Sequence, residues 1–236
     1  MNRPSLPFMV MNPSCAIFKD IRVVAFDCDG VMFDTRIANR HYYNRILEHL
    51  DRPSMTEEQF AFVHMHTVDN SLAHLFKDPA DLQKAQEFRS RMGYRPFLPY
   101  MKIEPTLRDL LGSLRPRYRT AIATNRTNTM APLLEAFHLE DDFDLVVCAS
   151  DVALPKPHPD VLLKILSHFA VEPRQVIYIG DSKLDAEAAE AAGVIFVAYG
   201  HDGLDGACRI QRLAELSALL DGAPCTGHGP DSSKET

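Results

Sequence analysis

The chain has 236 residues, of which 46% are hydrophobic and 24% are charged, and its formal net charge is −7. This composition is that of an ordinary globular protein, and the length allows one large domain or a core with a smaller inserted one. The negative charge argues against binding to a nucleic-acid backbone, which requires a basic face, and no apolar stretch is long enough for a membrane span. The five scattered cysteines lack C-x-x-C spacing, which favours reduced thiols and a cytoplasmic location.

Between two polar ends, short apolar runs alternate with helical patterns. Residues 1–18 are predicted to be a flexible extension, and residues 222–236 have the composition of a disordered tail. The predicted strands are 21–26, 118–123, 144–148, 175–179 and 194–198, and the predicted helices between them are 127–138, 159–169 and 182–192. Strands that are apolar on both faces and alternate with helices are typical of parallel sheets. We therefore predict an α/β fold with a Rossmann-like, doubly wound parallel sheet, formed by residues 19–33 and 101–221.

Residues 34–100 break this alternation. Their apolar spacing predicts helices over 37–50, 57–66, 68–76 and 80–92, and the segment contains no convincing strand. Prolines and a glycine separate these helices. A helical insertion directly after the first strand predicts a separate helical cap over residues 34–100.

Paired carboxylates follow two of the predicted strands. Asp27 and Asp29 come directly after the first strand, and Asp181 and Asp185 follow the strand 175–179. Single acidic residues at such places are usually solvated or favour a helix N-terminus, but parallel strands that end together would form one acidic cluster. Such a cluster suits a hard divalent cation. One carboxylate could attack phosphorus while a second exchanges a proton with the leaving oxygen.

Two further segments could complete a phosphate site. Thr124 and Asn125 follow the strand 118–123 and offer a hydroxyl, an amide and backbone N–H groups, although such a pair also makes a routine helix N-cap. Lys156 lies between two prolines that stiffen its loop, and its ammonium could neutralise both the carboxylates and a phosphate. Taken alone, Lys156 would be an ordinary exposed loop lysine.

The four segments in this order resemble the haloacid dehalogenase-like hydrolase superfamily, in the branch of phosphoglycolate phosphatases and β-phosphoglucomutases. The family's D-x-D-G-[TV] motif matches residues 27–31, and its Ser/Thr motif matches Thr124 and Asn125. The family lysine matches Lys156, and the G-D-x-x-x-D motif matches residues 180–185. The resemblance covers roughly residues 20–200, including a helical cap after the first motif.

The resemblance implies a role for each matched residue. Asp27 would be the nucleophile and a Mg²⁺ ligand, and Asp29 would be the general acid and base, with its backbone carbonyl on the metal. Asp181 would also bind the metal, and Asp185 would support the metal shell. The remaining implied roles are phosphate binding by Thr124, Asn125 and Lys156, with charge neutralisation by Lys156.

These matches predict a Mg²⁺-dependent phosphatase that acts on a small phosphorylated metabolite, as a monomer or homodimer. The alternatives are a β-phosphoglucomutase-like phosphoryl transfer, a metal-independent dehalogenase and a non-catalytic binding module. In the predicted cap, His64, His66 and Asn70 are candidates for substrate specificity, although exposed polar residues on a helix are usually only solvated.

Overall fold

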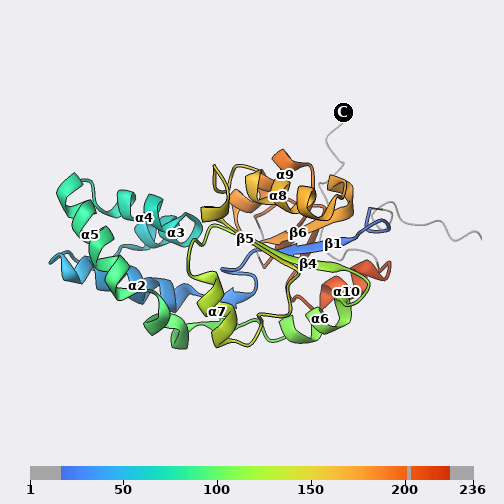
Figure 1. Cartoon of the computed structure of the whole chain (residues 1–236), viewed down its shortest axis with the longest axis horizontal. Coiled ribbons are helices and arrows are strands. Elements are labelled where there is room, and N and C mark those ends of the chain that lie inside the picture. The colour runs from blue at the N-terminus through green and yellow to red at the C-terminus, as the bar shows by residue number, and fades with distance from the viewer. Residues whose placement is uncertain (1–16, 201–202, 224–236) are drawn as a thin grey trace, which may run out of the picture.

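The computed structural model describes residues 17–200 and 203–223. Its centre is a parallel sheet of six strands (Figure 1). In spatial order they are β5 (Leu145–Cys148), β4 (Arg119–Thr124), β1 (Val23–Phe26), β6 (Val176–Gly180), β7 (Ile195–Tyr199) and β8 (Cys208–Ile210). The first strand in sequence is thus inside the sheet, paired in parallel with β4 on one side and β6 on the other. The carboxyl ends of these three strands therefore lie next to one another.

Helices cover both faces of the sheet (Figure 1). One face carries α8 (Asp160–Phe169) and α9 (Lys183–Ala192), and the other carries α6 (Leu107–Leu114), α7 (Met130–Ala136) and α10 (Glu215–Leu220). The strand β1 shows why both layers form. Val23 and Ala25 pack in the core beneath α8 and α9, while Val24 and Phe26 pack in the core on the opposite side. Because successive side chains of a strand point to opposite faces, a continuous apolar run needs cover on both.

Residues 34–100, hereafter the cap segment, form a group of helices at one end of the molecule (Figure 1). They are α2 (Arg36–His49), α3 (Glu57–Met65), α4 (Val68–Leu75), α5 (Pro79–Met92) and the 3-10 helix η1 (Arg95–Tyr100). Local sequence fixes several of their ends. Thr56 makes a capping box with Gln59, Asp78 accepts hydrogen bonds from the first turn of α5, and Gly93 ends that helix with a φ of 65°. The chain enters and leaves through a short antiparallel pair, β2 (Phe33–Asp34) with β3 (Lys102–Ile103).

The predicted α/β class is confirmed, and each predicted core strand overlaps an observed one with ends that differ by no more than two residues. The sequence did not reveal β8 or the β2–β3 pair, whose strands have three and two residues. Short 3-10 turns lie at Ala149–Asp151 and Pro173–Gln175. Within the described ranges, no helix has the length and apolar character needed to cross a bilayer.

The cysteines depart in part from the expectation of reduced thiols. Cys28 and Cys148 are free and buried, but Cys208 is disulfide-bonded. The predicted extension 1–18 falls almost wholly outside the described residues, and so does most of the predicted tail 222–236.

Candidate active site

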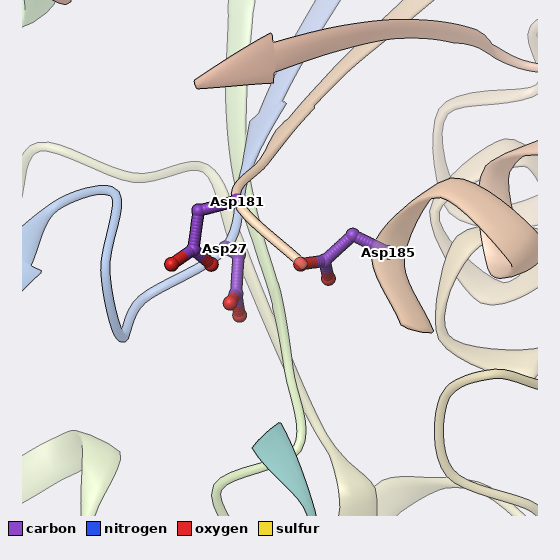
Figure 2. Close-up of side chains that lie close together, drawn as sticks. All are labelled: Asp27, Asp181 and Asp185. Atoms are coloured by element: carbon purple, nitrogen blue, oxygen red, sulfur yellow. The ribbon is translucent and has the colours of Figure 1, made fainter. Parts of the chain in front are cut away.

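Three carboxylates meet at the carboxyl ends of β1 and β6 (Figure 2). Asp27 directly follows β1, Asp181 directly follows β6, and Asp185 lies in the first turn of α9. The parallel register of β1 and β6 brings their ends together, and the Asp27 N–H donates to the Ile179 carbonyl at 2.8 Å. One oxygen from each carboxylate lies within 4.8 Å of the others. We call this cluster, Asp27, Asp181 and Asp185, the carboxylate nest.

Lys156 balances part of this negative charge. It comes from the loop before α8, and its side chain is 3% exposed. Its Nζ donates to Asp27 Oδ1 at 2.8 Å, to Asp185 Oδ1 at 2.6 Å and to the Tyr178 hydroxyl at 2.8 Å. Burial would lower the pKa of Lys156, but the two carboxylates hold it above its usual range. The lysine is therefore a fixed, charged part of the site, as its predicted role requires.

One lysine does not neutralise the three carboxylates of the nest, of which two are buried and one, Asp181, is half-buried. Burial raises the pKa of Asp27 to about 7, against the pull of Lys156 and with help from the Asp185 and Asp29 carboxylates. Burial and the neighbouring Asp185 and Asp27 also raise the pKa of Asp181 well above its usual value. Like charges held this close need a cation or protons. An all-oxygen set of this kind fits a hard divalent cation such as Mg²⁺.

Gly30 lets the loop after β1 pass beside the nest. Its φ is +84°, and a Cβ at this position would overlap the carboxylate of Asp181. The glycine of the first motif is thus required for both its backbone conformation and its lack of a side chain.

Asp29 is held by an arginine that the sequence reading did not identify. Arg126 Nε donates to Asp29 Oδ2 at 2.7 Å, and Arg126 Nη2 donates to Asp29 Oδ1 at 2.8 Å. Burial alone would raise the pKa of Asp29, but the charge and hydrogen bonds of Arg126 lower it to about 2. Asp29 is therefore a carboxylate with both oxygens engaged in this arrangement.

Thr124 and Asn125 lie beside the nest, as the sequence predicts, but their side chains already have partners. The Thr124 hydroxyl accepts from the Arg126 N–H at 3.2 Å. The Asn125 side chain accepts from the Lys156 N–H at 2.9 Å and donates to the Lys156 carbonyl at 3.1 Å. It also donates to the Met65 carbonyl of the cap segment at 3.2 Å. The Asn125 amide thus fixes the lysine loop and joins it to the cap segment.

A cavity of about 80 Å³ opens from the nest and is lined by residues of both the sheet side and the cap segment. His64 and His66 line it, whereas Asn70 is exposed and is not part of the lining. The polar lining residues that were not foreseen include Arg126, Arg89, Tyr94 and Asn39. Among these four, only Arg126 had a usable sequence signal, because it directly follows the Thr124-Asn125 pair at a strand end.

The comparisons with known proteins agree with this geometry. Residues 24–199 match the family model described as haloacid dehalogenase-like hydrolase. The chain is 30% identical to a phosphoglycolate phosphatase of Shigella boydii serotype 4 over 212 residues, which cover 78% of this chain and 84% of that protein.

Solved structures with the same fold differ widely in their sequence identity to this chain. A HAD-superfamily hydrolase, subfamily IA, variant 1, from Geobacter sulfurreducens PCA is 40% identical with a TM-score of 0.71, covering 86% of this chain and 97% of that one. A β-phosphoglucomutase from Clostridium difficile also has a TM-score of 0.71, with coverage of 85% and 97%. At 16% identity, its likeness shows the fold alone.

Proposed function

Because this chain belongs to the haloacid dehalogenase-like hydrolase family, we propose that it hydrolyses a small phosphate monoester through a phosphoaspartate at Asp27. The family match and the phosphoglycolate phosphatase relatives support a phosphatase that acts on small phosphate esters. The observation that carries the mechanism is the carboxylate nest with Lys156 bonded into it. The proposed substrate resembles phosphoglycolate or a sugar phosphate. The cavity, of about 80 Å³, is small, which suits a small ester.

The proposed cofactor is Mg²⁺, held by the carboxylates of Asp27 and Asp181 and the backbone carbonyl of Asp29. Asp185 would support this set, since it already accepts from Lys156 and from the Ser182 N–H. When bound, the cation would withdraw charge from the phosphoryl oxygens and so favour attack on phosphorus.

In the proposed reaction, a carboxylate oxygen of Asp27 attacks phosphorus and the ester P–O bond breaks. Asp29 first takes up a proton from solvent once its hydrogen bonds to Arg126 open, and it gives that proton to the leaving oxygen. The Asp29 carboxylate then takes a proton from the water that attacks the phosphoaspartate. This second attack releases inorganic phosphate and restores Asp27. Lys156 offsets the charge that gathers on the phosphoryl group, and Thr124 with the backbone at Asn125 holds the phosphoryl oxygens.

The cap segment would supply recognition of the rest of the substrate. The support is that the cavity is lined from both sides, and that Asn125 is bonded to the Met65 carbonyl. We propose the division into an α/β core and a helical cap at residues 34–100 on this basis. A monomer or homodimer and a cytoplasmic location remain predictions from the sequence.

The test is a turnover assay of the full chain with a panel of small phosphate esters, in Mg²⁺ and in EDTA. We expect release of inorganic phosphate in Mg²⁺ only, and no turnover by Asp27→Asn, which keeps the shape of the side chain but loses the nucleophile. Asp109→Asn, at an exposed aspartate in the first turn of α6, is the matched control and should match wild type. Full activity of Asp27→Asn or of the EDTA-treated protein would overturn the mechanism.

The same assay distinguishes the three alternative functions that the sequence leaves open. A mutase would return the phosphoryl group to a sugar phosphate and release little inorganic phosphate. A metal-independent dehalogenase would ignore EDTA, and a binding module would turn over nothing.

A further inference from the structure

The Arg126 side chain is bonded to Asp29, the residue whose carboxyl group has to face the leaving group. Its guanidinium makes two parallel hydrogen bonds to the two oxygens of Asp29, and its side chain is only 7% exposed. For Asp29 to pass a proton to a leaving oxygen, at least one of these bonds has to open. A buried guanidinium that loses an acceptor is costly unless another oxygen replaces it.

The protein around Arg126 holds the guanidinium in place and offers little to replace Asp29. Nη1 donates to the Thr129 hydroxyl at 3.1 Å, and Nη2 donates to the Tyr94 hydroxyl at 3.3 Å. The guanidinium also lies over the Tyr94 ring, 4.7 Å from its centroid. These partners are neutral. The replacement acceptor would therefore have to come from the ligand in the cavity.

The cavity has an excess of positive charge away from the nest. Beyond the nest and Lys156, its charged lining consists of Asp29, Arg126 and Arg89. Arg89 comes from α5 of the cap segment and pairs with Asp69 at 2.7 Å, but the Asp69 side chain is 65% exposed. An ion pair with such a solvent-exposed partner contributes little to stability, although the Arg89 side chain itself is 20% exposed. Two guanidiniums therefore face the part of the cavity that the alcohol half of an ester would occupy.

We propose that Arg126 is a specificity-determining residue that binds an anionic group, a carboxylate or a second phosphate, on the alcohol half of the substrate. The substrate anion takes the place of Asp29 on the guanidinium fork and frees Asp29 to face the leaving oxygen. A planar guanidinium is suited to both anions because it binds either one through two parallel hydrogen bonds. This inference rests on the proposed phosphatase function and names the class of ester that the enzyme takes.

The proposal predicts a preference between substrates that differ only in that anion. The carboxylate arm compares 2-phosphoglycolate with its neutral amide, 2-phosphoglycolamide. The phosphate arm compares propane-1,3-diol bisphosphate with 3-hydroxypropyl phosphate. In at least one arm, wild type should favour the anionic member by about 10- to 100-fold in kcat/KM, the range expected for a charged hydrogen bond.

Variants of Arg126 show whether this residue is responsible. In Arg126→Gln the preference should fall to within about threefold of unity, and in Arg126→Lys it should be intermediate, because the charge remains but the fork is lost. Arg45→Gln, at an exposed arginine that pairs with Glu48 on α2, should keep the wild-type preference. If Arg126→Gln has no turnover, the same ratio is measured as binding affinity in Asp27→Asn and in the Asp27→Asn, Arg126→Gln double variant.

Each outcome decides the question. Turnover of both members of each pair at equal kcat/KM by wild type overturns the role of Arg126 while leaving the phosphatase function intact. A wild-type preference that persists in Arg126→Lys and Arg126→Gln shows that Arg126 only holds Asp29 and also overturns it. No turnover of any ester by wild type would instead overturn the proposed function itself.

Discussion

Replacing Lys156 with methionine tests whether this lysine holds the carboxylate nest together. The Lys156 ammonium is bonded to both Asp27 and Asp185, and the Lys156 and Asp185 side chains are 3% and 0% exposed. Removing one partner of a buried ion pair typically costs about 3–5 kcal/mol, because the remaining charge has neither water nor a partner. We therefore expect metal-free Lys156→Met to lose about 3–5 kcal/mol of unfolding free energy at pH 8. For a chain of this size, that loss corresponds to a fall in Tm of roughly 6–20 °C.

The loss should depend on pH in a defined direction. The pKa of Asp27 is raised from 3.8 to about 7 in the fold, so the folded state holds this proton more tightly than the unfolded chain. Stability in the absence of metal is then favoured at low pH and falls as pH rises from about 4 towards 7. At pH 5.5 the protonated Asp27 no longer needs Lys156, and the variant should lose less than at pH 8.

Urea unfolding of the purified proteins, in EDTA and in saturating Mg²⁺, measures both effects. Mg²⁺ should stabilise the variant more than wild type, because the cation replaces the lost positive charge; binding at a hundred times the Kd is worth about 2.7 kcal/mol. Lys183→Met, at a lysine on α9 with an 82% exposed side chain, is the matched control and should change stability by less than about 0.5 kcal/mol. A Lys156→Met loss no larger than this control, or equal at pH 5.5 and pH 8, would refute the account.

Three further perturbations probe the rest of the site. Gly30→Ala should lower Tm and remove nearly all turnover, because a Cβ there would overlap a nest carboxylate and the φ of +84° disfavours any side chain; an active, stable variant would contradict this geometry. Mg²⁺ affinity, measured by calorimetry, should tighten as pH rises from 5.5 to 7 and then level off, because protons compete for Asp27, whose pKa is about 7; a flat profile would show that protons and metal do not compete. Substitution of His64 or His66 should alter the relative kcat/KM among substrates by about tenfold. Substitution of Asn70, which lies outside the cavity lining, should leave these ratios unchanged. If the ranking of substrates is the same in all three variants, the two histidines have no role in specificity.

The core and the carboxylate nest could be predicted because both depend on local sequence signals. The apolar runs that form β1, β4 and β6 are buried on both faces, and such runs are recognisable without knowledge of their neighbours. Asp27 and Asp181 each follow one of these runs directly. Parallel strands then bring the acidic ends together, which is a property of the topology rather than of side-chain packing.

The parts that were missed depend on contacts between distant segments. The strand β8, Cys208–Ile210, has only three residues, with an arginine at its centre, which is too short for an alternation to be recognised in the sequence. Tyr94 and Arg89 lie at the site only because the cap segment packs against the sheet side. Nothing local distinguishes either residue from an ordinary one on a helix surface. The sequence therefore predicts the presence of the cap segment but not which of its side chains face the cavity.

Two parts of the cavity have different tasks in the proposed reaction. The proposed phosphate end is built from strand ends, and its nest and lysine would bind a phosphoryl group whatever alcohol is attached. Under this proposal the choice among esters is made elsewhere in the cavity, whose lining includes Arg126 and Arg89. Arg126 is unusual in belonging to both ends, because its backbone follows Thr124 and Asn125 while its side chain holds Asp29. Arg126 can therefore link two events of the proposed reaction. When it binds the alcohol half of the substrate, it releases Asp29, which protonates the leaving oxygen of that alcohol.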